Sequence, residues 1–378
     1  MGQSPSTLAQ VSARAGCSAA TVSRVLNNSG TVSPAVRQNV LKAVKESGYK
    51  PRRTQRTVRD LVSATHPRTK TTESRFEVIL HRHSPMEQIS TNDGTMHLGP
   101  SSEVTGRDLI SQTYSLASDF YMQILNGVMD ELAFASNRAM VQASVDLMDP
   151  QIIKSVNRSE ISGVILIGEY SPSLPDFLEQ CHKPVVLVDI IHTGRADVVT
   201  TDNLAGIELA MDHLLELGHQ KIGYVGAPRN RSFQERWATW QWKMASAGLA
   251  VNSQWVYHGP ESIHDTVEDV KKILAGEPQR PTAMVCATDC GAMGVVRAAE
   301  QCGISIPDQL SVVGFDDTSA SALVTPPLTT VHVPLREMGQ RAVRQLLVNV
   351  SYESNLSGSI IRMSPELVVR QSTARCPS

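Results

Sequence analysis

Short apolar runs alternate with segments of helical periodicity from Phe76 to beyond Phe315, and this alternation restricts the fold more than any other feature of the chain. The runs are rich in Val, Ile and Leu, as is typical of parallel strands that are covered by helices on both faces. The predicted strands are 76–80, 139–143, 164–168, 184–189, 221–226, 283–287 and 310–315, and the predicted helices are 120–135, 202–217, 236–247 and 293–302. The sequence therefore predicts α/β architecture for this part.

The alternation restarts near Asp202, so we expect two doubly wound parallel-sheet lobes of similar size. Residues 84–117 follow neither period and are interpreted as a long insertion or loop. A chain of 378 residues is too long for one ordinary core, which agrees with several domains.

Polar residues follow three of the predicted strands. They are Asp189, Thr288-Asp289 and Asp316-Asp317. Ligands of such sheets bind at the carboxyl ends of the strands, so these residues mark a candidate binding site. The structural alternative is that at least one of Asp289 and Asp317 caps the helix that follows it.

An enzyme of the same architecture is the rival class. The sequence has no glycine-rich phosphate loop, no Gly-x-Ser-x-Gly elbow and no His/Glu set with metal spacing. Asp316 and Asp317 would make an acid/base pair, but adjacent residues at a strand end usually point apart. Catalysis is the weaker hypothesis, and we expect no cofactor and no metal.

The first fifty residues have a different, helical pattern. Leu8 and Val11 lie on one face of a short helix, and Val22, Val25 and Leu26 lie on one face of a second. Gly16 suits a left-handed turn between the two helices, and Ser18 suits the cap of the second. A third amphipathic segment runs from Ser33-Pro34 to Gly48. Three such helices predict an all-α helix-turn-helix domain whose second helix reads the DNA major groove.

Charge supports this interpretation. Residues 1–75 hold 13 Lys/Arg against 3 Asp/Glu, whereas residues 76–378 hold 22 against 34. A basic head on an acidic body suits a protein that holds nucleic acid at one end only. A solvated helical module without any nucleic-acid role is the less probable alternative.

Other sequence features bear on the cellular location, the cysteines and the linker. Met1-Gly2-Gln3-Ser4 opens no export signal, and no apolar run is long enough to span a membrane, so we expect a cytoplasmic, nucleoid-associated protein. The six cysteines are scattered and are interpreted as buried free thiols. Residues 52–61 fit one short helix, and the polar, Thr-rich stretch 62–75 reads as a linker.

Four blocks of residues, in order, resemble the lactose-repressor/galactose-repressor (LacI/GalR) family of bacterial transcription regulators. The blocks are Thr7–Val11 with Ala20–Asn27, Val32–Pro34 with Gly48–Pro51, Thr201–Asn203 with His213–Ile222, and Val312–Asp317 with Thr325–Val331. The match covers nearly the whole chain except about residues 62–75 and 84–117. The resemblance implies a helix-turn-helix domain at 1–50, a hinge helix and linker at 51–75, and an effector-binding and dimerisation domain of periplasmic-binding-protein type at 76–378. Its first lobe would comprise about 76–200 and 331–350, and its second about 201–330 and 351–378.

The resemblance also implies a homodimer, or a tetramer built from two dimers, on a roughly palindromic operator of double-stranded DNA. Ala19, Ala20 and Arg24 match the base-reading positions, and the alanines offer only methyl contacts, so Arg24 would carry most direct readout. Phosphates would be held by Thr7, Ser18, Thr21, Ser23 and Asn27. The hinge departs from the family pattern, because Gln55 and Val58 stand where alanine and leucine are usual; Val58 is our expected minor-groove residue.

In the body, the family's effector positions match Phe120, Tyr121, Asp189, Arg236, Thr288 and Asp316. The implied effector is a sugar or sugar derivative that binds between the lobes and controls operator affinity, and we expect the protein to be a repressor. A nucleobase or an acidic metabolite is the alternative, because Ser118-Asp119 replaces the usual Asn-Pro and the loop 259–262 lacks an aromatic residue. Structural alternatives also stay open: Phe120 or Tyr121 in the core, and Arg236 paired with Glu235 or another surface acid. Whether the effector acts as inducer or corepressor is left open.

Overall fold

The chain divides into two compact units, Met1–Thr71 and Thr72–Ser378, and each is described by itself. The computed structural model describes residues 12, 14–18, 21–22, 36, 39–40 and 42–44 of the first unit, and residues 74–81, 88–90, 96–98, 114–259, 263–276, 280–352 and 358–377 of the second.

The described residues of the first unit agree with three packed helices. Ala15, Val22, Val40 and Ala43 form a small buried cluster. Gly16 has φ +64°, in the left-handed region that the turn was predicted to need. The Ser18 hydroxyl accepts a hydrogen bond from the Thr21 N–H at 3.2 Å, so Ser18 caps the second helix as predicted.

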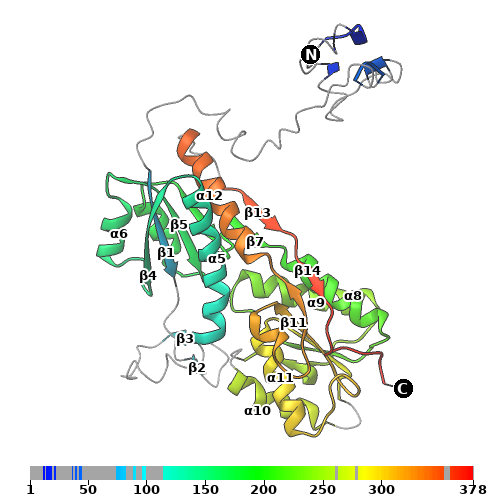
Figure 1. The fold of residues 1–378 in the computed structure, drawn as a ribbon. Coiled ribbons are helices and arrows are strands. Elements are labelled where there is room, and N and C mark those ends of the chain that lie inside the picture. Colours follow the sequence, from blue (N-terminus) through cyan, green and yellow to red (C-terminus); the bar gives the residue numbers. More distant parts are fainter. Residues whose placement is uncertain are drawn as a thin grey trace. The chain divides into compact units, whose positions relative to one another are not determined.

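The first lobe of the second unit is built on a six-stranded parallel sheet in the order β13-β7-β6-β5-β1-β4 (Figure 1). Its strands are β1 (Arg75–His81), β4 (Arg138–Ser144), β5 (Ile161–Gly168), β6 (Val185–Val188), β7 (Asp197–Thr201) and β13 (Ile360–Met363). Its helices are α5 (Tyr114–Phe134), α6 (Pro150–Val156), α7 (Leu174–Gln180) and α12 (Leu335–Tyr352). Every residue of β6 is buried, which is why its sequence is an unbroken apolar run.

The second lobe repeats the plan with a sheet in the order β14-β12-β11-β10-β8-β9, in which only β14 is antiparallel. Its strands are β8 (Ile222–Val225), β9 (Val256–Tyr257), β10 (Ala283–Cys286), β11 (Ser311–Asp316), β12 (Thr329–His332) and β14 (Glu366–Val368). Its helices are α8 (Asn203–Glu216), α9 (Arg231–Ser246), α10 (Ile263–Leu274) and α11 (Asp289–Gln301). The strands and helices predicted between residues 76 and 315 are thus all present, whereas the helix predicted at 52–61 lies outside the described residues.

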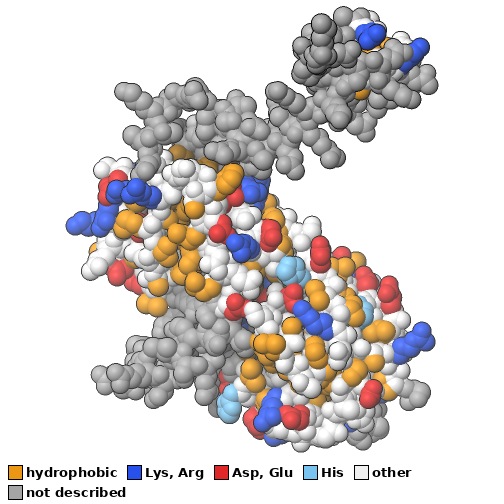
Figure 2. Space-filling model, viewed as in Figure 1, with side chains coloured by type: hydrophobic (Ala, Val, Ile, Leu, Met, Phe, Trp, Pro, Cys, Tyr) orange, Lys and Arg blue, Asp and Glu red, His pale blue; other side chains and the backbone are white. Residues whose placement is uncertain are grey.

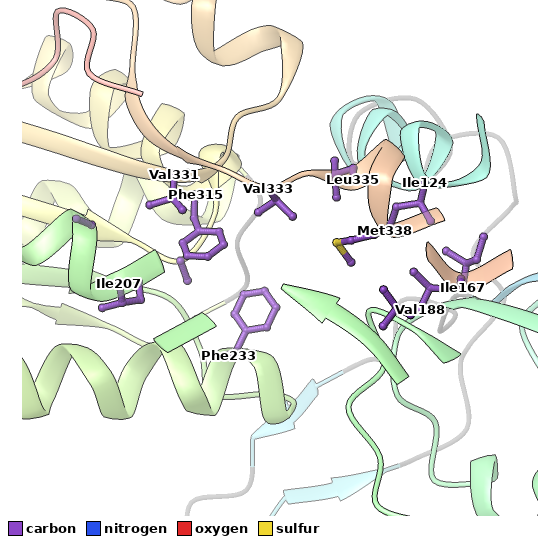
Figure 3. Packing of buried hydrophobic residues seen from close by; sticks show 14 of the residues in the cluster. Ile124, Ile167, Val188, Ile207, Phe233, Phe315, Val331, Val333, Leu335 and Met338 are labelled. Carbon is purple, nitrogen blue, oxygen red and sulfur yellow. The ribbon is translucent and has the colours of Figure 1, made fainter. Parts of the chain in front are cut away.

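One apolar cluster runs through both lobes. It includes Phe315 and Val331 of the second lobe and Ile124 and Met338 of the first. Figure 3 shows Val333, in the segment between β12 and α12, lying between these two groups. The lobes therefore share buried surface at the segment that joins them.

Helices α5 and α12 cross closely over the first sheet. A Cβ added to Gly127 of α5 would lie 1.9 Å from the Arg336 carbonyl oxygen, and one added to Gly339 of α12 would lie 2.1 Å from the Ile124 oxygen. Glycine at both positions lets the two backbones approach to a distance that no side chain permits.

The chain passes between the sheets three times: after β7, after β12, and between β13 and β14. The last passage departs from the predicted boundaries, which assigned residues 351–378 to the second lobe, because β13 pairs with β7 in the first sheet. The side chains of β13 alternate between exposed and partly buried, so this edge strand carries no apolar run that would reveal its sheet.

Several smaller expectations are corrected. Within 84–117, read as a loop, β2 (Gln88–Ser90) and β3 (Met96–Leu98) form an antiparallel pair, and α5 already begins at Tyr114. Neither Asp289 nor Asp317 caps a helix: the Thr288 hydroxyl caps α11 by accepting the Gly291 N–H. The cysteines are free, but only Cys181 and Cys286 are buried as expected; Cys302 is exposed after α11, and Cys17, Cys290 and Cys376 are partly exposed.

Among the described residues, no helix is long and apolar enough to cross a membrane. In the same part of the chain, no group of three or more His, Cys, Asp or Glu side chains has the arrangement of a metal site.

Candidate effector site between the lobes

A cavity of about 330 Å³ lies between the carboxyl ends of the first sheet and the start of α9. Its first-lobe wall consists of Tyr170, after β5, and residues 189–193, after β6. Its second-lobe wall consists of residues 229–232 and Gln234, where the chain enters α9. This is the position at which ligands of open α/β sheets bind.

Asp189 forms the polar base of the first-lobe wall. Its backbone has φ +65°, a conformation that is uncommon for any residue but glycine and concentrates at functional sites. Burial raises the pKa of Asp189 to about 7, and nearby Glu169 adds to the increase, while Arg236 and Arg229 act in the opposite direction. The carboxyl group therefore exchanges its proton near neutral pH and can donate or accept a hydrogen bond.

Arg236 is a buried arginine directly behind the second-lobe wall, with only 3% of its surface exposed. Its Nε donates to the Asn203 Oδ1 at 2.8 Å and its Nη1 donates to the Ala287 carbonyl at 2.5 Å. The guanidinium lies 3.6 Å from the centre of the Phe315 ring. The alternative of a surface pair with Glu235 is wrong, since Glu235 instead receives both Nη groups of Arg362, at 2.7 and 2.8 Å.

Asp316 ends β11 and faces Arg236, with the Oδ1 3.6 Å from the Arg236 Nη1. Its φ of +110° is another departure from ordinary backbone, and Asp317 follows with φ +54°. Asp317 accepts hydrogen bonds from Arg370 and His332, at 2.5 and 2.9 Å. The strained turn after β11 therefore sets the direction of the Asp316 carboxylate.

Two further aspartates hold the residues that follow. The buried Asp289 accepts hydrogen bonds from the Thr318 N–H at 2.7 Å, the Thr318 hydroxyl at 3.0 Å and the Thr330 hydroxyl at 2.5 Å. Asp119, on α5 of the first lobe, accepts from the Ser319 hydroxyl at 2.8 Å and the Ser319 N–H at 3.3 Å. The turn is thus attached to the second lobe through Asp289 and to the first lobe through Asp119.

The structure brings together three of the six predicted effector residues. Asp189 lines the cavity, and Arg236 and Asp316 contact each other behind its wall. Phe120 and Tyr121 meet edge to face at 5.2 Å and pack partly buried against the core, and neither lines this cavity. Thr288 serves as the cap of α11 and is also outside the lining.

The sequence reading missed the cavity residues at the start of α9. Arg229, Arg231 and Ser232 were overlooked because the helix was predicted to begin at Arg236. The signal was present: Asn230 caps α9 through its Oδ1 and the Phe233 N–H, at 3.2 Å. An Asn followed by a polar first turn is a helix start.

Of the predicted DNA-contacting residues, Ser18 and Thr21 lie in the described part of the head. Their hydroxyl groups are 2.9 Å apart at the start of the second helix. Thr7, Ala19, Ala20, Ser23, Arg24, Asn27 and Val58 lie outside the described residues, as does Gln55 in the predicted hinge.

Comparison with known proteins gives two family matches along the chain. Residues 7–52 match the bacterial regulatory proteins of the lacI family. Residues 211–373 match the periplasmic binding protein-like domain.

Individual proteins are similar over nearly the full length. The HTH-type transcriptional repressor PurR of Haemophilus influenzae is 26% identical over 375 residues, which is 97% of this chain and 98% of that protein. A complex of the transcriptional regulator CelR with cellobiose has a TM-score of 0.63 at 23% identity, covering 97% of this chain and 99% of that one. The lac repressor dimer bound to operator and the anti-inducer ONPF has a TM-score of 0.63 at 23% identity, covering 98% and 100%.

Proposed function

Because the chain belongs to the LacI family of transcriptional regulators and carries a periplasmic-binding-protein-like effector domain, we propose that a sugar or sugar derivative in the cavity between the lobes controls its affinity for operator DNA. The family is one of DNA-binding repressors rather than enzymes. The observation that carries the proposal is the convergence of Asp189, Arg236 and Asp316 at the cavity and its wall.

The chemistry of these groups fits a polyhydroxylated ligand. Carboxylates accept hydrogen bonds from hydroxyl groups, and an arginine fork donates to them. Asp189 lines the cavity from the first lobe and residues 229–232 line it from the second, backed by Arg236 and Asp316, so a ligand that contacts both walls stabilises one arrangement of the lobes. That arrangement sets the spacing of the heads in a dimer, and thereby operator affinity. The PurR relative keeps a nucleobase as the alternative effector.

For the head, we propose that Arg24 reads a base, with Ala19 and Ala20 in methyl contact. Thr7, Ser18, Thr21, Ser23 and Asn27 would hold phosphates, and Val58 would enter the minor groove. Such a protein works at the nucleoid, in the cytoplasm.

A homodimer is supported by apolar side chains left exposed on the first lobe. They lie on α5, on the edge strand β4 and directly after β4, and Figure 2 shows apolar side chains over this part of the lobe. The exposed residues are Met122, Met129, Phe134, Met140, Val141 and Val145. Monomers seldom expose an apolar surface of this kind, whereas a two-fold interface would bury it.

The test of DNA reading begins with operators selected from a random DNA library and fluorescence anisotropy at several salt concentrations. The full-length protein should show a steep salt dependence, and removal of residues 1–61 should abolish binding. Arg24→Ala should weaken binding to the selected operator about tenfold to a hundredfold. Operators that are already changed at the base that Arg24 reads should bind the variant nearly as well as they bind the wild type. A uniform loss on all operator variants would show that Arg24 only contacts the backbone.

The test of effector control is a thermal-shift screen of sugars, sugar acids and nucleobases, since a ligand stabilises the state it binds. Every ligand that raises the Tm is then added to the operator-binding assay. We expect at least one of them to change operator affinity, and its sign distinguishes inducer from corepressor. Constant operator affinity with all bound ligands would overturn the coupling.

A further inference from the structure

The second-lobe wall of the cavity has features that hydroxyl recognition does not require. The wall is the N-terminal end of α9, a helix of 16 residues. The N–H groups of Phe233 and Gln234 bond to Asn230, but the N–H groups of Arg231 and Ser232 have no partner among the described residues. The end of a helix with free N–H groups carries a partial positive charge.

The Ser232 side chain independently indicates a ligand. It lines the cavity while only 6% of the residue is exposed. Among the described residues, its hydroxyl has no hydrogen-bond partner. The Ser232 oxygen is not fully enclosed by protein, so it opens to the cavity and is available there to a ligand.

Two arginines flank the same helix end. Arg229 lies 3.8 Å from the centre of the Phe233 ring, which holds its guanidinium at the cavity wall. Arg231 is half exposed, and its nearest carboxylate, Glu235, is 3.8 Å away. Because Glu235 is already bound by both Nη groups of Arg362, it neutralises Arg231 only weakly. The first turn of α9 holds no acidic residue.

We propose that the start of α9, with Arg229, Arg231 and Ser232, binds an anionic group of the effector, a phosphate or carboxylate carried by a polyhydroxylated molecule. The anionic end lies on the second-lobe wall, and hydroxyl groups reach Asp189 on the first-lobe wall. This inference rests on the proposed function of the cavity and specifies the class of effector. Free N–H groups, a hydroxyl and guanidinium forks are the donors that such oxyanions take in proteins.

The charge on Asp189 predicts how anion binding depends on pH. Glu169, Arg229 and Arg236 act on this carboxyl group, and His192 also lines the cavity. Burial lowers the pKa of His192, so this ring is neutral at pH 7 and above. Since Asp189 loses its proton near pH 7, a bound anion meets an additional negative charge at pH 8 and not at pH 6.

The first experiment measures binding of inorganic phosphate and of sulfate to the full-length protein by thermal shift, against chloride at equal ionic strength. We expect saturable stabilisation in the millimolar range. The double variant Arg229→Gln/Arg231→Gln should lose at least tenfold in affinity, and Ser232→Ala severalfold. The matched control is Arg297→Gln, on an exposed arginine of α11 that pairs with Glu300, which should bind like wild type.

Circular dichroism and the anion-free Tm check that each variant is folded. Sulfate remains a dianion between pH 6 and pH 8, so its affinity in wild type should fall over this range, and Asp189→Asn should remove most of the fall. Absence of saturable binding, or equal binding by the double variant and wild type, would overturn the proposal.

The second experiment compares glucose with glucose 6-phosphate and gluconate for their effects on Tm and on operator affinity. We expect the charged members to stabilise wild type more than the neutral sugar, with the difference lost in the double variant. If neutral sugars alter operator affinity equally in wild type and the double variant, the result supports effector control and contradicts the anion site. If phosphate binds at the arginines while no bound anion changes operator affinity, the result supports the anion site and contradicts effector control.

Discussion

The two walls of the cavity are built by opposite means. The first-lobe wall is a strand end, where a strained backbone presents Asp189 and burial works against its charge. The second-lobe wall is a helix start, where free N–H groups and two arginines present positive charge. The difference teaches that neither wall is a complete site for the proposed effector, because the carboxyl group that would bind its hydroxyls lies on one wall and the positive charge that would bind its anionic group lies on the other. A ligand with both kinds of group is therefore required to join the lobes.

The largest expected effect comes from Arg236, behind the second-lobe wall. Arg236→Leu removes the donor to the Asn203 Oδ1 and the Ala287 carbonyl and the positive charge facing Asp316, and we expect a loss of about 3–5 kcal/mol in the free energy of unfolding. Urea unfolding measures it. Arg297→Leu, on an arginine whose side chain is 59% exposed, should change stability by less than about 0.5 kcal/mol. Equal losses of stability in the two variants would mean that the buried contacts of Arg236 do not stabilise the second-lobe wall.

The next effect concerns the first-lobe wall. The folded-state pKa of Asp189, about 7, lies above its ordinary 3.8, so the folded protein retains a proton that the unfolded chain has released. Asp189 therefore destabilises the fold increasingly from about pH 4 to pH 7, by about 1.4 kcal/mol per unit at most. Asp189→Asn should be stabilising, by up to a few kcal/mol at pH 8 and by less at pH 5. Asn also tolerates the positive φ. A difference in stability that did not grow with pH would contradict the raised pKa.

A smaller effect is expected at the Arg362–Glu235 pair, which joins β13 of the first sheet to α9 of the second lobe. A double-mutant cycle with Arg362→Gln and Glu235→Gln should give a coupling of roughly 1 kcal/mol at low salt, decreasing as salt is added. Thermal unfolding in two salt concentrations measures it. The Lys272–Asp269 pair, an exposed pair on α10, is the control and should show less coupling. A coupling free energy that does not depend on salt would argue against an electrostatic interaction between Arg362 and Glu235.

The smallest effect is expected where Asp119 of α5 meets Ser319 after β11. Asp119→Ala and Ser319→Ala should each cost about 0.5–1 kcal/mol, and the double variant little more than either. Hydrogen exchange of residues 316–319 should increase in Asp119→Ala and stay unchanged in Asp130→Ala, on the same helix, which removes an ion pair within the first lobe. Equal exchange in both variants would mean that Asp119 does not hold the turn.

The sequence predicted the cavity only where its residues follow regular elements. Asp189 and Asp316 were recognised because they end apolar runs, whose period is visible in the chain. Ser232 and Arg231 were not recognised, because the first turn of a helix has no apolar period and α9 was predicted to begin five residues late. The short strands β13 and β14 were missed for a related reason: their sheet membership depends on partners more than 30 residues away in sequence.

The position of β13 and β14 also affects how the protein is made. Met363 ends a strand of the first sheet and Glu366 begins a strand of the second. Synthesis proceeds from the N-terminus, so neither sheet has all its strands until residues 360–368 have left the ribosome. The two lobes therefore complete folding together at the end of translation, and a ribosome stalled before this segment holds two sheets that each lack an edge strand.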